Sequence, residues 1–222
     1  MAKIERKIYF DPEKAVDDWF KKEREYIVNR MKRLPSEDLS VYAEPRIRKL
    51  YHETYFLVSL GMHNASIVMC GVLLEALLKE VIFHKKNKEL SDYVGERKAD
   101  FGNAINFCKR ERYVTRNEEE WLVYVKNEIR NKYLHSNVGS IAKGIVFEVW
   151  PIPHKDAKEL LTVIQDIRSG KIKLPPPKLM TGDDFRPIAD IAKGQIDTER
   201  SLPLFLEVER FVREMVKRHF EP

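Results

Sequence analysis

The sequence predicts an all-α protein, a helical bundle, and three observations support this class. Apolar residues recur at helical spacing over most of the 222 residues. Prolines and glycines that can begin or end helices separate these stretches. Strand-like composition, rich in β-branched and aromatic residues, is confined to one short stretch at residues 144–150. We therefore expect a helical core with additional N- and C-terminal helices and a short strand-like insertion.

The composition allows a sizeable hydrophobic core and restricts the function only weakly. Hydrophobic residues make up 43% of the chain, and the 34% that are charged are of mixed sign. The net charge of +5 permits a nucleic-acid partner without requiring one. Met1–Lys7 lack the apolar region of a secretory signal, and Cys70 and Cys108 lie in apolar helical patterns without metal-binding spacing. These features favour a cytoplasmic protein with reduced thiols and no metal or other cofactor.

The first predicted helix begins at Asp11-Pro12, an N-cap followed by proline at the first helical position, and runs to about Lys32. Charged residues occupy its other faces, so we expect an outer helix that covers the core on one side. The side chains expected to make that contact are Val16, Trp19, Phe20, Ile27 and Met31.

A second helix is predicted from Ser36 to about Leu60, with Pro45 either bending it or restarting it and Gly61 as a C-cap. Ala65 to about His84 is apolar nearly all round, which predicts a central core helix that is too short to span a membrane. Glu75 is the exception on it. Either it pairs with Lys79 one turn later, or it is a half-buried carboxylate that holds an arginine from another helix.

A charged connector over residues 85–98 leads to a short helix from Phe101 to Arg110. After residue 139 we expect a strand or extended segment at 144–150, a helix at 155–168 ended by Gly170, and an irregular surface arm at 171–200. A terminal helix follows at 203–220. This pattern divides the chain into an outer helix (1–35), a helical core (36–142) and a C-terminal extension (143–222).

The helix at residues 120–137 concentrates the polar chemistry of the chain. On a helical wheel one side carries apolar side chains and the other a group of polar ones, with Arg130 at the border. Two asparagines on the polar side lower helix propensity, which indicates a hydrogen-bonding role. The apolar side comprises Leu122, Val125, Ile129 and Tyr133, and the polar side comprises Tyr124, Asn127, Glu128, Asn131 and His135.

A purely structural interpretation also explains part of this pattern. Cations in the last turns of a helix interact favourably with its negative dipole end, and Asn137 and Gly139 can act as C-cap residues. The spacing itself is common, because Arg46 and His52, and also Arg213 and His219, are similarly separated. What distinguishes Arg130 is the neutral amide of Asn131 beside it, where the other two arginines are followed by Ile47 and Glu214.

The segment from Arg130 to His135, Arg-Asn-Lys-Tyr-Leu-His, resembles the arginine, polar residue and histidine signature of the HEPN superfamily of helical RNA-processing domains. The preceding segment Gly71–Lys79 is similar to the core helix of several such proteins, and the resemblance covers roughly residues 40–140. It implies a bundle with a HEPN-like four-helix core, which dimerises with two such helices facing each other, and metal-independent cleavage of RNA.

Three functional hypotheses follow. The first is an endoribonuclease of toxin or phage-defence type, with RNA as substrate, a homodimer as the active form and a cognate antitoxin as a further partner. In it His135 is the general acid or base, Arg130 stabilises phosphate charge, Asn131 orients either group, and Asn127, Lys132 and Tyr124 bind substrate. The second is a non-catalytic RNA- or nucleotide-binding module. The third is a helical scaffold that docks a protein through residues 171–200.

Overall fold

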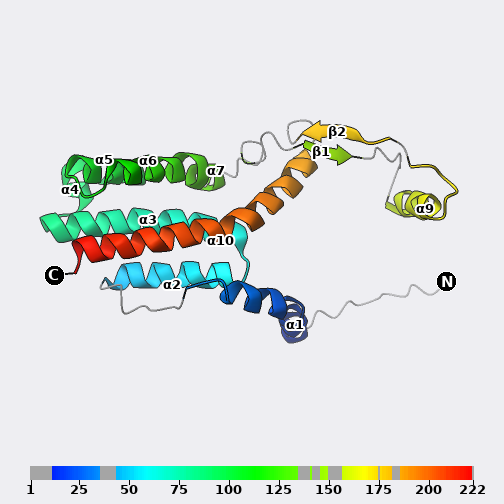
Figure 1. Ribbon diagram of the computed structural model, residues 1–222, viewed down its shortest axis with the longest axis horizontal. Coiled ribbons are helices and arrows are strands. Elements are labelled where there is room, and N and C mark those ends of the chain that lie inside the picture. The colour runs from blue at the N-terminus through cyan, green and yellow to red at the C-terminus, as the bar shows by residue number, and fades with distance from the viewer. Residues whose placement is uncertain are drawn as a thin grey trace, which may run out of the picture.

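A computed structural model describes residues 12–35, 44–134, 141, 146–149, 157–174, 176–181 and 186–221. It confirms the predicted all-α class: helices form the bundle, and the described β-structure is one two-stranded sheet. Figure 1 shows the bundle with the sheet and one helix set apart at one end of the molecule. None of the described helices combines the length and apolar character needed to cross a membrane.

Helix α3 (His63–Lys86) is the centre of the bundle, as its composition predicts. It packs against α2 (Pro45–Ser59) on one side and α10 (Arg186–His219) on another, and Figure 1 shows the three lying roughly parallel. Pro45 begins α2, and the predicted helix start at Ser36 lies outside the described residues. Gly61 follows α2 with a φ of +72°, where a residue without Cβ avoids strain, as the predicted C-cap requires.

Helix α1 (Pro12–Met31) has the predicted length but a different environment. Its last turn is anchored where α2 meets α3, since Arg30 Nε donates to the Ser59 carbonyl at 3.1 Å and Leu34 is buried. The expected apolar contact with the core is wrong for four of the five predicted side chains, whereas Ile27 is half-buried. Val16, Trp19, Phe20 and Met31 are 39–54% exposed, because α1 extends past the edge of the bundle, as Figure 1 shows.

Two short elements interrupt the predicted connector at 85–98: α4 (Leu90–Val94) and the 3-10 turn η2 (Glu96–Lys98). Burial of Leu90 and a reciprocal capping pair between Glu89 and Asp92 stabilise α4. Helix α5 (Phe101–Arg110) has the predicted bounds.

The predicted 120–137 helix is observed as three consecutive helical pieces. They are α6 (Arg116–Tyr124), a π-helical turn η3 (Val125–Arg130) and α7 (Asn131–Leu134). Thr115 and Glu118 cap the start of α6 reciprocally. This capping role accounts for one of the three consecutive carboxylates, Glu118, Glu119 and Glu120, near the start of that helix. The predicted end of this helix, with His135, Asn137 and Gly139, lies outside the described residues.

The predicted strand is confirmed as β1 (Val146–Val149), and helix α9 (Ala157–Arg168) follows with Gly170 after it. The irregular arm predicted for 171–200 is confirmed for residues 171–174 and 176–177, which have no regular structure, and is wrong for residues 178–181 and 186–200. Residues 178–181 form β2 (Lys178–Thr181), which pairs antiparallel with β1 so that Val146 lies opposite Thr181. This pairing joins residues about thirty positions apart, so no local pattern reports it.

The terminal helix is also longer than predicted, because α10 begins at Arg186 and Pro203 lies inside it. Proline removes one intrahelical hydrogen bond and crowds the preceding turn, which bends a helix without always ending it. Figure 1 shows α10 changing direction part-way along. Packing of the second half against α3 offsets the lost hydrogen bond.

One hydrophobic core joins both sides of the predicted division at residue 142. Side chains from α3 and α5 share it with those from the second half of α10, including the fully buried Phe205. Cys70 and Cys108 are both buried free thiols, and burial raises the pKa of Cys108 to about 12. The division of the chain into 1–35, 36–142 and 143–222 stays a prediction. The hydrophobic core itself runs continuously across the boundary at residue 142.

Candidate active site on the motif helix

The helix predicted at residues 120–137, observed as α6, η3 and α7, is called the motif helix here. Its predicted two-sided character is confirmed for its described part. Leu122, Val125, Ile129 and Tyr133 are all buried, with 0–4% exposure. On the other side, Tyr124, Asn127 and Glu128 are exposed, and Asn131 is half-buried. Arg130 lies between the two sides, with 21% of its side chain exposed.

The π-helical turn ends at Arg130. The amide of Asn131 donates to the carbonyl of Lys126, five residues earlier, instead of four as in an α-helix. Such turns insert one residue into a helix, weaken its hydrogen-bond geometry and are frequent at functional sites. At the end of this turn Arg130 reaches Glu75 on α3, while Ile129 and Tyr133 are buried.

Arg130 is held by an ion pair across the bundle. Its Nη2 donates to Glu75 Oε2 on α3 at 2.6 Å, and its guanidinium carbon lies 5.7 Å from the ring centre of Phe101 on α5. Lys79 Nζ binds the other oxygen of Glu75, also at 2.6 Å. Both predicted alternatives for Glu75 are therefore observed together: it pairs with Lys79 and it holds an arginine from another helix.

One donor of Arg130 has no acceptor in the part of the chain that the structure describes. Its Nε is buried and makes no hydrogen bond among the described residues. Buried donors are nearly always satisfied, because an unpaired one costs roughly 1–3 kcal/mol. Any acceptor for this Nε must therefore come from outside the described residues.

Gly71 on α3 allows the close approach of Arg130. A Cβ built at Gly71 would lie 2.9 Å from Arg130 Cγ and 3.0 Å from its Cβ and Cδ. A glycine inside the most apolar helix costs about 1 kcal/mol relative to alanine, so its presence in the sequence was a signal of a close contact.

We predict that Gly71→Ala destabilises the protein by about 1–3 kcal/mol, because the added methyl group must displace the Arg130 side chain. Gly194→Ala in α10 is the matched control, since nothing lies within 4 Å of its Cβ position. There alanine should stabilise the helix by about 0.5–1 kcal/mol. Urea unfolding of both variants measures the difference, and equal effects would contradict the contact.

The structure does not give the other predicted site residues the same environment. Lys132 Nζ pairs with Glu128 at 2.6 Å on its own helix. Tyr124 faces α10, where it lines a hollow of about 380 Å³ with Arg200 and Glu207. Asn127 is exposed, and His135 lies outside the described residues, so its distance from Arg130 is not described.

The two arginine and histidine pairs with similar spacing, Arg213 with His219 and Arg46 with His52, lie in other environments: the first histidine is buried and the second is exposed. His219 is buried, and its Nε2 lies 2.9 Å from the carbonyl oxygen of Tyr113; burial is the main cause that lowers its pKa. His52 is exposed on α2, and Arg46 lies 3.6 Å from Glu80. The spacing alone therefore does not identify a site.

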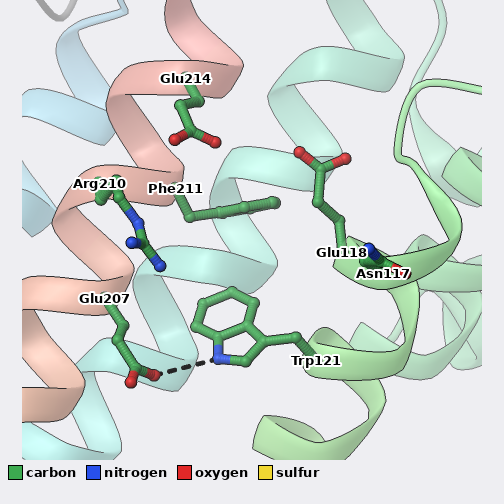
Figure 2. Close-up of a pocket in the computed structure, with 7 residues that line it drawn as sticks. All are labelled: Asn117, Glu118, Trp121, Glu207, Arg210, Phe211 and Glu214. Carbon is green, nitrogen blue, oxygen red and sulfur yellow. Dashed lines mark hydrogen bonds between the residues drawn. The ribbon is translucent and has the colours of Figure 1, made fainter.

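A second hollow of about 300 Å³ lies between α6 and α10 (Figure 2). Trp121 Nε1 donates to Glu207 at 3.2 Å and its ring centre lies 5.2 Å from that of Phe211. Arg218 binds Glu118 beside it at 2.8 and 3.0 Å. Carboxylates outnumber arginines around this hollow and around the hollow lined by Tyr124. This charge disfavours binding of a phosphate backbone at either place. The lining residues of this hollow are Asn117, Glu118, Trp121, Glu207, Arg210, Phe211 and Glu214.

A buried polar cluster, which the sequence did not reveal, fixes the end of the motif helix to α10. The Tyr133 hydroxyl donates to Asp197 Oδ1 at 2.5 Å, and Lys193 Nζ lies 2.5 Å from Oδ2 and 4.8 Å from the tyrosine ring centre. Burial is the main cause that raises the pKa of Tyr133, and the hydrogen bond to Asp197 adds to it. Asp197 lies outside the region of HEPN resemblance.

Comparison with known proteins finds no matching family model, curated protein or solved structure. Among the described residues, no three His, Cys, Asp or Glu side chains gather closely enough to hold a metal ion.

Proposed function

We propose that this chain is a metal-independent endoribonuclease whose site consists of Arg130, Asn131 and His135. The observation that carries the proposal is the setting of Arg130. A π-helical turn ends at this residue, Glu75 and Phe101 hold its guanidinium in place, and its buried Nε has no acceptor among the described residues. An arginine fixed before substrate binds can stabilise charge with little reorganisation.

The chemistry needs no cofactor, because RNA carries its own nucleophile. The 2′-oxygen attacks the adjacent phosphorus as its proton passes to a base, and the 5′-oxygen leaves with a proton from an acid. Imidazole exchanges a proton near neutral pH, so His135 can serve in either role. Arg130 stabilises the developing negative charge on the phosphoryl oxygens, and Asn131 orients the phosphate or the histidine.

One histidine cannot easily act as base and acid on opposite sides of one phosphorus. A homodimer in which two motif helices face each other would supply both, which gives dimerisation a catalytic reason. Asn127, Lys132 and Tyr124 would bind the RNA strand, Tyr124 by stacking on a base, because the carboxylates around its hollow disfavour phosphate. The resemblance places such an enzyme in the cytoplasm, as a toxin or phage-defence nuclease with a cognate antitoxin, and buried reduced thiols suit that compartment.

The ion pair with Glu75 bears on whether Arg130 is available to RNA. It engages Nη2, and an arginine side chain has five N–H donors, so a phosphate can use donors that Glu75 does not take. The same pair also suits a second function, a non-catalytic RNA- or nucleotide-binding module in which Arg130 is structural.

The test is cleavage of single-stranded RNA by the native chain and by His135→Ala and Arg130→Lys, in the presence of a chelator. We expect cleavage that survives chelation, products ending in a 2′,3′-cyclic phosphate, and a loss of about 100-fold or more in each variant. A substrate with a 2′-deoxyribose at the cleaved position should be inert. Arg130→Lys keeps the charge but not the bidentate geometry, which limits damage to the fold.

His52→Ala is the matched control, because His52 follows Arg46 at similar spacing on an exposed surface. It should cleave RNA at the native rate. Cleavage unchanged by His135→Ala, or abolished by the chelator, would contradict the proposed site. Salt-sensitive RNA binding without any cleavage would favour the binding module.

A further inference from the structure

The apolar stripe of α1 has a partner at only one end. Its last turn is held against the α2–α3 junction through Arg30 and Leu34. The same stripe continues toward the start of the helix, where Val16 and Phe20 remain about half exposed. Trp19 and Phe20 contact each other edge to face, with ring centres 5.0 Å apart. The described residues therefore cover the end of this stripe and leave its beginning open to solvent.

The spacing of the stripe is that of a helix which packs along another helix. Its apolar residues Val16, Phe20 and Ile27 lie at positions of a coiled-coil seam, and the charged Glu23 and Arg30 occupy the two other seam positions. Such a seam follows one side of a helix continuously. It is therefore suited to a second helix and not to a small molecule.

The charges beside the stripe favour a second copy of α1 in antiparallel orientation. Asp17 and Arg24 lie two turns apart, on the same flank of the stripe, and neither forms an ion pair with another described residue. In an antiparallel pair, equivalent flanks of the two helices meet. Asp17 of each copy then lies beside Arg24 of the other, and two-fold symmetry produces this attraction twice.

A parallel pair would instead bring opposite flanks together at the same height. Equivalent stripe positions would also meet, so Glu23 would lie beside Glu23 of the second copy, which is repulsive. The same antiparallel register places Val16 opposite the second copy's Ile27. It also brings Trp19 beside the second copy's Tyr26, so that exposed aromatic surface is covered.

We propose that α1 is a self-association surface, and that two copies of this chain pair through antiparallel α1 helices centred between Phe20 and Glu23. The occupant of the stripe is the same stripe on another molecule. One helix pair lies at the lower end of the range for specific interfaces, roughly 1,200 Å², so the dimer should form at micromolar concentration.

This surface is separate from the motif helix and does not rest on the ribonuclease proposal. Figure 1 shows α1 and α7 toward the same end of the bundle, where α3 begins. One two-fold axis at that end can relate both α1 helices and both motif helices. If so, α1 would help to hold the two copies of Arg130 and His135 together.

The experiment is sedimentation velocity of the full chain between about 1 and 100 µM. The native chain should shift from monomer to dimer over this range. Asp17→Arg and Arg24→Asp should each raise the dissociation constant about tenfold or more, because two attractions become two repulsions. An equimolar mixture of these two variants should form heterodimers near the native affinity, since every repulsion becomes an attraction again.

Asp18→Arg is the matched control: it makes the same charge change at the next residue, which faces away from the stripe, and should leave dimerisation unchanged. Phe20→Glu should give a monomer with native circular dichroism. A native chain that stays monomeric at 100 µM would overturn the proposal. So would single variants that dimerise normally, or a mixture that is no better than either variant. RNA cleavage is measured separately, so loss of the dimer and loss of the catalytic site are distinguishable.

Discussion

Replacing Glu75 with alanine is expected to lower the free energy of unfolding by about 3 kcal/mol. Glu75 is 16% exposed and binds both Arg130 and Lys79 at 2.6 Å. Removing one member of a largely buried ion pair leaves the other charge without compensation, and this loss exceeds the net value of the pair itself. Arg130 is most affected, because its buried Nε already has no acceptor among the described residues.

The design that isolates this effect uses a double variant and a surface control. Glu75→Leu with Arg130→Met removes both charges and should be less destabilised than Glu75→Ala alone. Glu53→Ala breaks the exposed pair with Lys49 and should change stability by less than about 0.5 kcal/mol. Urea unfolding measures all three. A Glu75→Ala variant as stable as Glu53→Ala would show that the ion pair does not hold Arg130.

The same variants separate the two functional proposals. If Arg130 acts on RNA, Glu75→Ala should reduce cleavage at temperatures where the protein is still folded, because the guanidinium loses its fixed position. If Arg130 is only structural, Glu75→Ala should alter stability and leave RNA binding intact.

Phe205→Ala should destabilise the protein by about 3–5 kcal/mol, the second large effect. Phe205 lies on α10 with no exposed surface, and its ring centre is 5.7 Å from that of Tyr51 and 6.0 Å from that of Tyr55. Truncation removes a buried ring and leaves a cavity among side chains that can close it only partly.

The neighbouring residue supplies the control. Leu206 is 37% exposed, and Leu206→Ala should cost less than about 1 kcal/mol. Thermal unfolding of both variants measures the contrast. A small effect at Phe205 would mean that the C-terminal extension is an appendage, whereas the expected effect makes it part of the core.

Local patterns were sufficient for the helices that carry their own signals. The segment Phe101–Arg110 has a capping aspartate and a clear apolar side, and its predicted bounds match the structure. The buried side of the motif helix was likewise predictable from spacing. The π-helical turn was not, because one inserted residue barely alters the order of apolar and polar residues over so short a helix.

The candidate site was predictable in part for the same reason. Arg130 and Asn131 stand out in the sequence, and Glu75 could be described as a possible partner of an arginine. Which arginine it holds, and that Lys79 shares it, depends on how α3 and η3 pack. The contribution of Asp197 to the end of the motif helix is a contact between residues 64 positions apart.

The sequence by itself determined the helical class, most helix bounds, the central position of α3 and the two-sided motif helix, because these follow from spacing within a few turns. Tertiary structure alone decided that β2 pairs with β1 and that α10 continues through Pro203 into the core. It also decided that α1 extends into solvent. The first two outcomes depend on contacts between distant segments, whose free energy outweighs the local preference of a proline. The third depends on where the bundle ends, which the apolar stripe of α1 does not report.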